Sequence, residues 1–180
     1  VEYYEKSLNI YLMIYGENAS WGIANVSIGM GRVYSNQGDY SKALVCFEGA
    51  LKIFLLLNGD NHPAVATSYS YIGQIYFAQN SKALDYFKKS LKLDLSFFGE
   101  NHPSVASGYY NIGYVYFAQG DYSKALEYFE EVLKIRLSVY GENHSRVASV
   151  YNDIGEIYSV QGDDFKALDY FKKSLKIVLS

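Results

Sequence analysis

Residues 112–133 read IGYVYFAQGDYSKALEYFEEVL, and four copies of this pattern run along the 180-residue chain. Each copy holds a glycine, a tyrosine three residues later, and a Lys-Ala-Leu triplet that a phenylalanine and a leucine follow at helical spacing. The landmark glycines are Gly31, Gly73, Gly113 and Gly155. They are separated by 42, 40 and 42 residues. A fixed period of this length indicates a repeat protein.

Each copy is predicted to form two antiparallel helices, as residues 103–140 illustrate. Pro103 suits the first turn of a helix, where its missing N–H is harmless, and apolar residues then recur at helical spacing. Gly120 tolerates the positive φ that often ends a helix. Asp121 or Ser123 can then cap the second helix.

The core of each copy is predicted to lie between its two helices. In the third copy, Gly113 and Ala125 should let the helices approach closely, and Tyr116 and Phe129 should fill the space beside them. Aromatic residues near the start of the second helices are expected to pack between the helices: Tyr40, Tyr122 and Phe165. Three tyrosines of the first helices are also assigned to the core: Tyr69, Tyr109 and Tyr151.

The second copy departs from the pattern between its helices. Residues 79–82 read QNSK, where the third copy has QGDYSK at residues 119–124. Two residues are missing, one of them aromatic, although Asn80 can still adopt the left-handed conformation. We expect a tighter turn here and the weakest helix packing of the four copies.

The phase of the pattern gives the organisation of residues 1–180, which we interpret as one segment of a repeat array. Residues 1–15 align with the second helix of a copy. Four helix pairs are expected to follow at residues 20–57, 63–98, 103–140 and 145–180. Neither end shows the polar capping helix that normally closes an array. We therefore expect the repeats to continue in both directions.

The composition argues against several classes of function. The formal net charge is −3 and the isoelectric point is about 5.6, so no basic footprint for nucleic acid or for an anionic membrane is present. The longest apolar run, residues 53–57, is far shorter than the roughly 20 residues of a membrane-spanning helix. A single cysteine, Cys46, excludes an internal disulfide. A cytoplasmic location is expected.

The order of small residue, tyrosine, Gly-Asp-Tyr, Lys-Ala-Leu, aromatic residue and leucine resembles the tetratricopeptide repeat. The loop Gly-Glu-Asn-His-Pro at residues 99–103 and the period resemble the long repeats of kinesin light chains and similar scaffolds. The resemblance covers essentially the whole chain. It implies an all-α superhelical solenoid of antiparallel helix pairs, in which the first helices line a concave groove that binds peptides.

The first helices carry the candidate binding residues. Residues 63–79 and 103–119 contain no charged side chain, whereas charges gather on the second helices. Asn111 lies two residues before Gly113, where the resemblance implies a ligand-binding asparagine, and Asn152 is one residue away from the matching place. The predicted peptide-binding set is Arg32, Tyr71, Gln74, Phe77, Tyr110, Asn111, Tyr114, Phe117, Asn152 and Glu156. The alternative for the aromatic members is packing against a neighbouring repeat.

No pattern indicates catalysis, a metal or a cofactor. The histidines recur once per repeat, on the order of 10 Å apart along a stack of packed helices, and are interpreted as loop residues before a helix: His62, His102 and His144. Cys46 has no histidine near it in the sequence that could activate its thiol, and it is interpreted as a small buried side chain. We therefore do not expect an enzyme.

Two functions remain open. The first is a scaffold that binds a peptide or partner segment in the groove, as in a kinesin light chain-like cargo adaptor. The second is a regulatory or sensing arm of a larger ATPase or protease whose catalytic domain lies elsewhere. In both cases the partner is a protein or peptide, with no nucleic acid and no membrane. Exposed apolar faces at the terminal helices could also let the fragment associate end to end.

Overall fold

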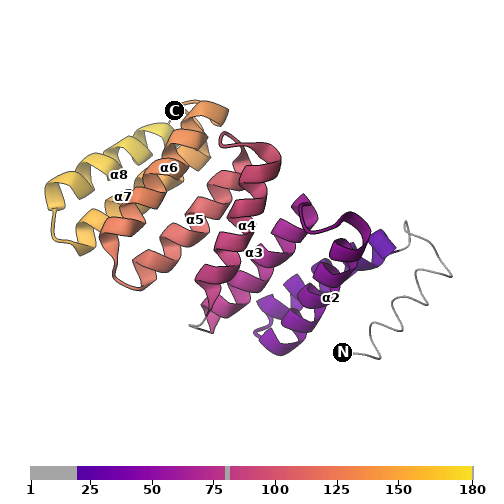
Figure 1. Cartoon of the computed structure of the whole chain (residues 1–180). Helices are drawn as coiled ribbons and strands as arrows, with labels where there is room; N and C mark the ends of the chain where they lie inside the picture. Colours follow the sequence, from indigo (N-terminus) through magenta and orange to yellow (C-terminus); the bar gives the residue numbers. More distant parts are fainter. Residues whose placement is uncertain (1–19, 80–81, 180) are drawn as a thin grey trace. The chain divides into compact units, whose positions relative to one another are not determined.

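The computed structural model describes residues 20–79 and 82–179, and it is helical with short connections (Figure 1). The described residues contain no strand. A first helix covers residues 20–36. The helices after it are α2 (Tyr40–Asn58), α3 (Pro63–Ala78), α4 (Ala83–Phe98), α5 (Pro103–Ala118), α6 (Tyr122–Tyr140), α7 (Ser145–Val160) and α8 (Asp164–Val178). Two expectations fall outside the described residues: the partial repeat at residues 1–15 and the shortened turn around residues 80–81.

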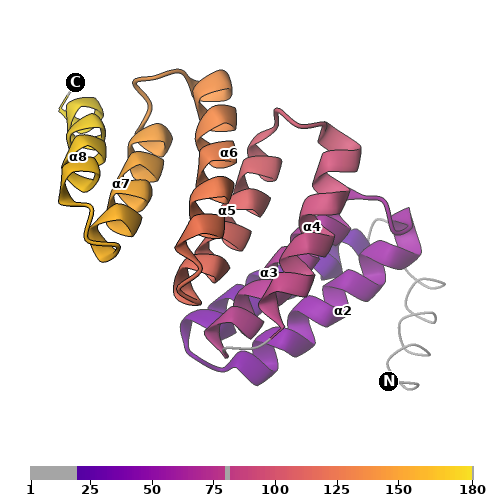
Figure 2. The same ribbon diagram turned by 60° about the vertical axis from the view of Figure 1, so that its left-hand side comes forward.

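The chain divides into two compact units, and the boundary lies within α4, after Leu93. In the first unit, α2 packs against α3. In the second unit, α5 packs on α6, α6 on α7, and α7 on α8, an order that is plain in Figure 2. This alternation of paired helices confirms the predicted all-α repeat architecture.

The first helix of a pair begins in the same way in three copies. In each, a histidine lies just before the helix, and its Nδ1 accepts a hydrogen bond of 3.1 Å from a backbone N–H in the first turn. The three histidines are His62, His102 and His144. Pro63 and Pro103 follow two of them as first helical residues. The histidines are thus helix caps, in agreement with their interpretation as loop residues before a helix.

The second helix of a pair also has a recurrent start. Gly120 has a φ of +76°, which a side chain would strain, and this confirms the expectation for that glycine. The next residue, Asp121, accepts a hydrogen bond from the backbone N–H of Lys124 and pairs with its ammonium group at 2.5 Å. Asp39 and Asp163 cap α2 and α8 in the same way. The second helices α2, α6 and α8 thus start from a turn that the sequence encodes.

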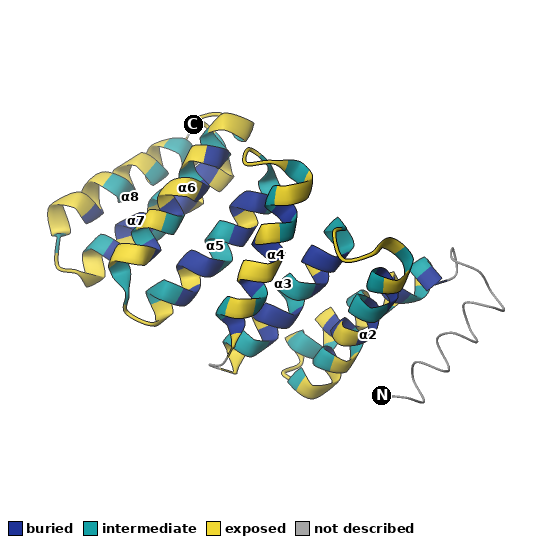
Figure 3. Ribbon diagram, viewed as in Figure 1, coloured by how far each residue is buried: buried dark blue, intermediate teal, exposed yellow. Residues whose placement is uncertain are grey.

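Small residues bring the two helices of a pair into contact. A Cβ atom on Gly113 would lie 3.1 Å from the Cβ of Tyr128 and 3.6 Å from the carbonyl oxygen of Ala125. At Gly73 the same atom would lie 2.7 Å from the buried ring of Phe87. The buried residues form stripes on the facing sides of the helices (Figure 3). The close approach predicted at the landmark glycines is therefore confirmed.

The prediction that Phe165 packs between its helices is wrong. Its side chain is 91% exposed, whereas Tyr40 packs against the core of the first unit and Tyr122 lies against Phe117. Phe165 stands one residue later in the repeat than these two tyrosines, at the place of the exposed Ser123. One residue turns a helical side chain by about 100°, so the ring faces away from the interface.

Candidate peptide-binding face

The predicted site residues of the first unit have mixed environments. Arg32 and Gln74 are exposed, and Tyr71 and Phe77 are partly buried. The ring of Tyr71 stacks on the core residue Phe47, with centroids 5.0 Å apart and planes 10° apart. Tyr71 therefore packs against a neighbouring repeat, as the alternative for the aromatic residues foresaw.

In the second unit, the predicted residues of α5 form one side of that helix. Tyr114 is 44% exposed, and Tyr110, Asn111 and Phe117 are partly buried. Three successive ring pairs, Tyr110–Tyr114, Tyr114–Phe117 and Phe117–Tyr122, have centroids 6.3, 6.1 and 5.9 Å apart. These four rings form a continuous aromatic row along α5 and the start of α6.

The aromatic row is fixed at one end and accessible in its middle. The ring of Tyr110 meets the buried Phe129 edge-on, with centroids 5.4 Å apart. The guanidinium of Arg136, on α6, lies 5.3 Å from the centre of the Tyr110 ring. Tyr114 is the member of the row that presents the largest exposed fraction. A partner that approached the row would therefore contact Tyr114 first. The neighbouring ring, Tyr110, is held by Phe129 and Arg136.

Helix α7 contributes polar residues. Asn152 and Glu156 are exposed, and Asp153 accepts a hydrogen bond from the hydroxyl of Tyr110. Burial raises the pKa of Asp153 to about 6, although the Tyr110 hydrogen bond and the charge of Arg136 act in the opposite direction. Burial, followed by the charge of Asp153, raises the pKa of Tyr110 to about 12.

Arg136 links the three helices of this region. Its guanidinium donates hydrogen bonds to the carbonyl oxygen of Arg146 at 2.8 Å and to the hydroxyl of Ser149 at 3.0 Å, while its charge acts on Asp153. Arg136, Tyr110 and Asp153 thus form a polar cluster, called the junction cluster below, that joins α5, α6 and α7.

Arg136 is absent from the predicted site residues because it lies on the second helix of its pair, whereas the candidates were on first helices. The repeat carried a signal, however. Phe54, Asp94 and Arg136 occupy the same position in three successive copies, and Asn111 and Asp153 share another. The residue at this repeat position thus changes from apolar to acidic to basic. Such a change indicates that the contacts between neighbouring repeats differ from one copy to the next.

Asp94 in α4 is buried, with 8% of its surface exposed, and burial raises the pKa of its carboxyl to about 6. The folded state therefore binds this proton more tightly than the unfolded chain. Its contribution to stability is complete below about pH 4 and is lost as the pH rises to about 6. Replacing Asp94 by asparagine should raise the free energy of unfolding at pH 7 by about 1–3 kcal/mol.

Urea denaturation of the wild-type protein and of Asp94→Asn at pH 4.5 and pH 7.5 measures this effect. The advantage of the variant should grow with pH, while replacing the exposed Asp85 on the same helix should give no such trend. An advantage of Asp94→Asn that does not change with pH would mean that the carboxyl is not the titrating group.

The described part of the chain offers little for other chemistry. It holds no group of three or more His, Cys, Asp or Glu residues placed to bind a metal ion. Burial raises the pKa of the Cys46 thiol, which lowers the fraction of reactive thiolate. No described helix has both the length and the apolar character that a membrane crossing needs.

Comparison with known proteins places the chain in a family. The tetratricopeptide-repeat profile matches residues 22–96, 80–138 and 104–180. Comparison with curated protein sequences gives no match. Tetratricopeptide repeats generally form non-catalytic scaffolds for protein–protein interaction.

Several solved structures share the fold. The crystal structure of BtubC (BKLC) from P. vanneervenii superposes with a TM-score of 0.82 at 22% identity, over 98% of this chain and 70% of that chain. A Podosopora anserina putative kinesin light chain with nearly identical TPR-like repeats gives 0.68 at 17% identity, over 98% and 84%. MamA gives 0.61 at 24% identity, over 96% and 85%. By its repeat sequence and its helix pairs, the chain belongs to the tetratricopeptide-repeat family.

Proposed function

We propose that the chain is a protein-interaction scaffold whose second unit binds an extended segment of a partner along α5 and α7. The observation that carries this proposal is the aromatic row, with Tyr114 44% exposed in its middle. Large exposed rings on a surface favour binding, because an aromatic side chain offers much contact area and loses few rotamers. Isolated exposed apolar residues are ordinary, but a row of neighbouring rings is not.

The polar residues beside the row suit a peptide backbone. Asn111 on α5 and Asn152 on α7 carry side-chain amides, which can both donate to a carbonyl and accept from an N–H. Glu156 adds an exposed carboxylate on α7. In the first unit, considered by itself, the exposed candidates are Gln74 and Arg32.

The charge pattern favours a neutral or apolar segment over an acidic one. Helix α5 contains no charged side chain. Arg136 is the cation next to the row, and it already contacts Tyr110, the carbonyl oxygen of Arg146 and the hydroxyl of Ser149. The carboxylate of Asp153 balances its charge. An acidic ligand would therefore have to compete with contacts inside the protein.

The finer role that we propose is a cytoplasmic kinesin light chain-like adaptor for a cargo protein. The structural similarity to a putative kinesin light chain supports this choice. The alternative is a regulatory or sensing arm of a larger ATPase or protease. Neighbouring sequence separates the two, since a heptad coiled coil favours the adaptor, and a phosphate-binding loop or protease signature favours the arm.

Capture from a peptide array by the purified chain tests the binding face. The double variant Asn111→Ala, Tyr114→Ala should bind the captured peptides at least about tenfold more weakly, because it loses one amide and the most exposed ring of the row. Phe165→Ala, which removes a ring that is 91% exposed on α8, is the matched control and should bind like the wild type.

Circular dichroism should show unchanged helix content in all three proteins. Sedimentation at the assay concentration reports whether the chain pairs end to end, for which the exposed Leu168, Leu175 and Val178 of α8 offer an apolar surface. If the double variant binds as well as Phe165→Ala, the α5 face is not the peptide site. If the wild-type chain captures no peptide, the result favours the alternative function, a regulatory or sensing arm of a larger protein.

A further inference from the structure

A tyrosine pair recurs in three copies of the repeat. One tyrosine comes from the first helix and the other from the second helix. The ring centroids are 6.2, 6.0 and 6.1 Å apart in the pairs Tyr69–Tyr86, Tyr109–Tyr128 and Tyr151–Tyr170. The rings make an angle of 46° in each pair. The three copies therefore build the same aromatic corner.

In the second and fourth copies, a lysine of the chain occupies this corner. The ammonium of Lys89 lies 5.6 Å from the centre of the Tyr69 ring and 5.3 Å from that of Tyr86. The ammonium of Lys173 lies 4.7 Å from the centre of the Tyr170 ring. The face of an aromatic ring attracts a cation within about 6 Å. The corner is thus a cation site that two copies fill from their own second helix.

The third copy has the same corner and the opposite charge. Glu131 stands at the repeat position of Lys89 and Lys173, and Glu130 stands beside it where the other two copies have a second lysine. The second helices of those two copies read DYFKKS, whereas residues 127–132 read EYFEEV. The tyrosine pair of the third copy therefore receives no cation from this position.

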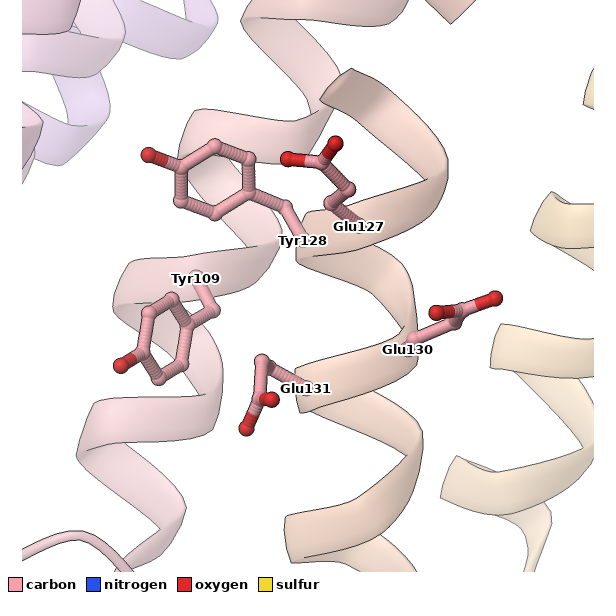
Figure 4. Close-up of a pocket in the computed structure, with 5 residues that line it drawn as sticks. All are labelled: Tyr109, Glu127, Tyr128, Glu130 and Glu131. Atoms are coloured by element: carbon pink, nitrogen blue, oxygen red, sulfur yellow. The ribbon is translucent and has the colours of Figure 1, made fainter. Parts of the chain in front are cut away.

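An open cavity of about 370 Å³ lies at this corner. Five residues line it: Tyr109, Glu127, Tyr128, Glu130 and Glu131. Figure 4 shows Tyr109 and Tyr128 on facing helices, with the carboxylates of Glu131 and Glu127 beside them. Burial is the main cause that raises the pKa of Tyr109, and the negative charge of Glu131 is the second. The assignment of Tyr109 to the core is therefore corrected, because the residue is partly buried and borders an opening.

Two lysines of the chain lie near this cavity. Lys124 attracts Glu127 electrostatically, and its ammonium lies 5.1 Å from the centre of the Tyr116 ring, which stacks on Tyr128. The ammonium of Lys134 lies 3.5 Å from Glu131, in an exposed pair on one helix whose lysine side chain is 69% accessible. Such pairs contribute little. The three carboxylates that line the cavity still outnumber these two lysines, and Lys124 is already paired with Asp121.

We propose that this cavity binds a lysine side chain from a basic segment of a partner protein. The ammonium takes the position over the Tyr109–Tyr128 pair that Lys89 and Lys173 take in their own copies, with Glu127 and Glu131 as counter-charges. The site differs from the aromatic row, because Tyr109 and Tyr110 project about 100° apart around α5. A partner could therefore occupy this corner whether or not a peptide lies along the row.

Titration of the chain, labelled with ¹³C in its tyrosine rings, with the synthetic peptide Ac-Gly-Lys-Lys-Gly-amide tests the proposal by NMR. The ring signals of Tyr109 and Tyr128 should shift and saturate, and the same peptide with acetylated lysines should leave them unmoved. Glu131→Lys should weaken binding about tenfold, since it supplies the ammonium that the other copies hold there. The fold should tolerate this change, because two copies carry lysine at that place.

Two further variants distinguish binding at this cavity from a general effect of the protein's net charge. Glu142→Lys makes the same change of net charge in an exposed loop and should bind the peptide like the wild type. The double variant Lys88→Glu, Lys89→Glu should gain a peptide-dependent shift at Tyr69 and Tyr86. Equal binding by wild type and Glu131→Lys, or equal loss in Glu142→Lys, overturns the proposal. Shifts at Tyr109 that follow protein concentration without peptide would assign the corner to a second copy of the chain and also overturn it.

Discussion

Replacing Phe129 by alanine should lower the free energy of unfolding by about 3–5 kcal/mol. The Phe129 side chain is 1% exposed, on the face of α6 that meets α5. Its Cε1 atom would lie 3.5 Å from a Cβ atom on Gly113, and its ring supports Tyr110 edge-on. Gly113 has no side chain that could fill the space left by the ring, so truncation should leave a cavity between α5 and α6.

Urea denaturation followed by circular dichroism measures this loss, with Phe165→Ala as the control. Phe165 is also a phenylalanine, but its ring is 91% exposed. Its removal should change the free energy of unfolding by less than about 0.5 kcal/mol. Repeat arrays can unfold in parts, so the loss should appear as an earlier transition of the second unit. Equal stability of Phe129→Ala and Phe165→Ala would contradict the packing described for α5 and α6.

Replacing Arg136 by alanine should cost about 2–4 kcal/mol, the second largest expected effect. The change removes two hydrogen bonds to α7 and the cation over Tyr110. It also leaves the carboxylate of Asp153 without its counter-charge, although one oxygen of that carboxylate is already buried and accepts no hydrogen bond from the described residues. Arg136 and Asp153 are both partly buried, and removing one of two opposite charges in such a setting leaves the other uncompensated.

A double-mutant cycle with Asp153→Asn isolates this contribution. The cost of Arg136→Ala should be smaller by about 1 kcal/mol or more when Asp153 is already neutral. Lys134→Ala, on the same helix and exposed, is the control and should be nearly neutral. Strictly additive losses in the cycle would show that Arg136 and Asp153 do not act on each other.

Local patterns in the sequence were sufficient to predict the helix pairs. Pro103 before an apolar stripe, Gly120 at a positive φ and Asp121 as a cap each act within a few residues of the chain, and the structure confirms all three. The close approach at Gly113 was also predictable, because only a glycine recurs at this position in every copy.

Features that depend on the exact repeat register or on three helices were not predictable in the same way. Phe165 misled because it is one residue out of phase with Tyr122. The junction cluster combines Tyr110 from α5, Arg136 from α6 and Asp153 from α7, and no short window of sequence contains all three. Tyr109 differs from Tyr69 and Tyr151 only through its neighbours, since a glutamate replaces the lysine that covers the pair elsewhere.

Partners are proposed to bind on the exposed side of α5. Photo-crosslinking tests this proposal most directly, with benzoylphenylalanine placed at Tyr114 in one protein and at Phe165 in another, each incubated with a peptide captured from the array. We expect a crosslink from position 114 that unlabelled peptide competes away, and no crosslink from position 165. A competed crosslink from position 165 alone, or equal crosslinks from both positions, would contradict the proposal.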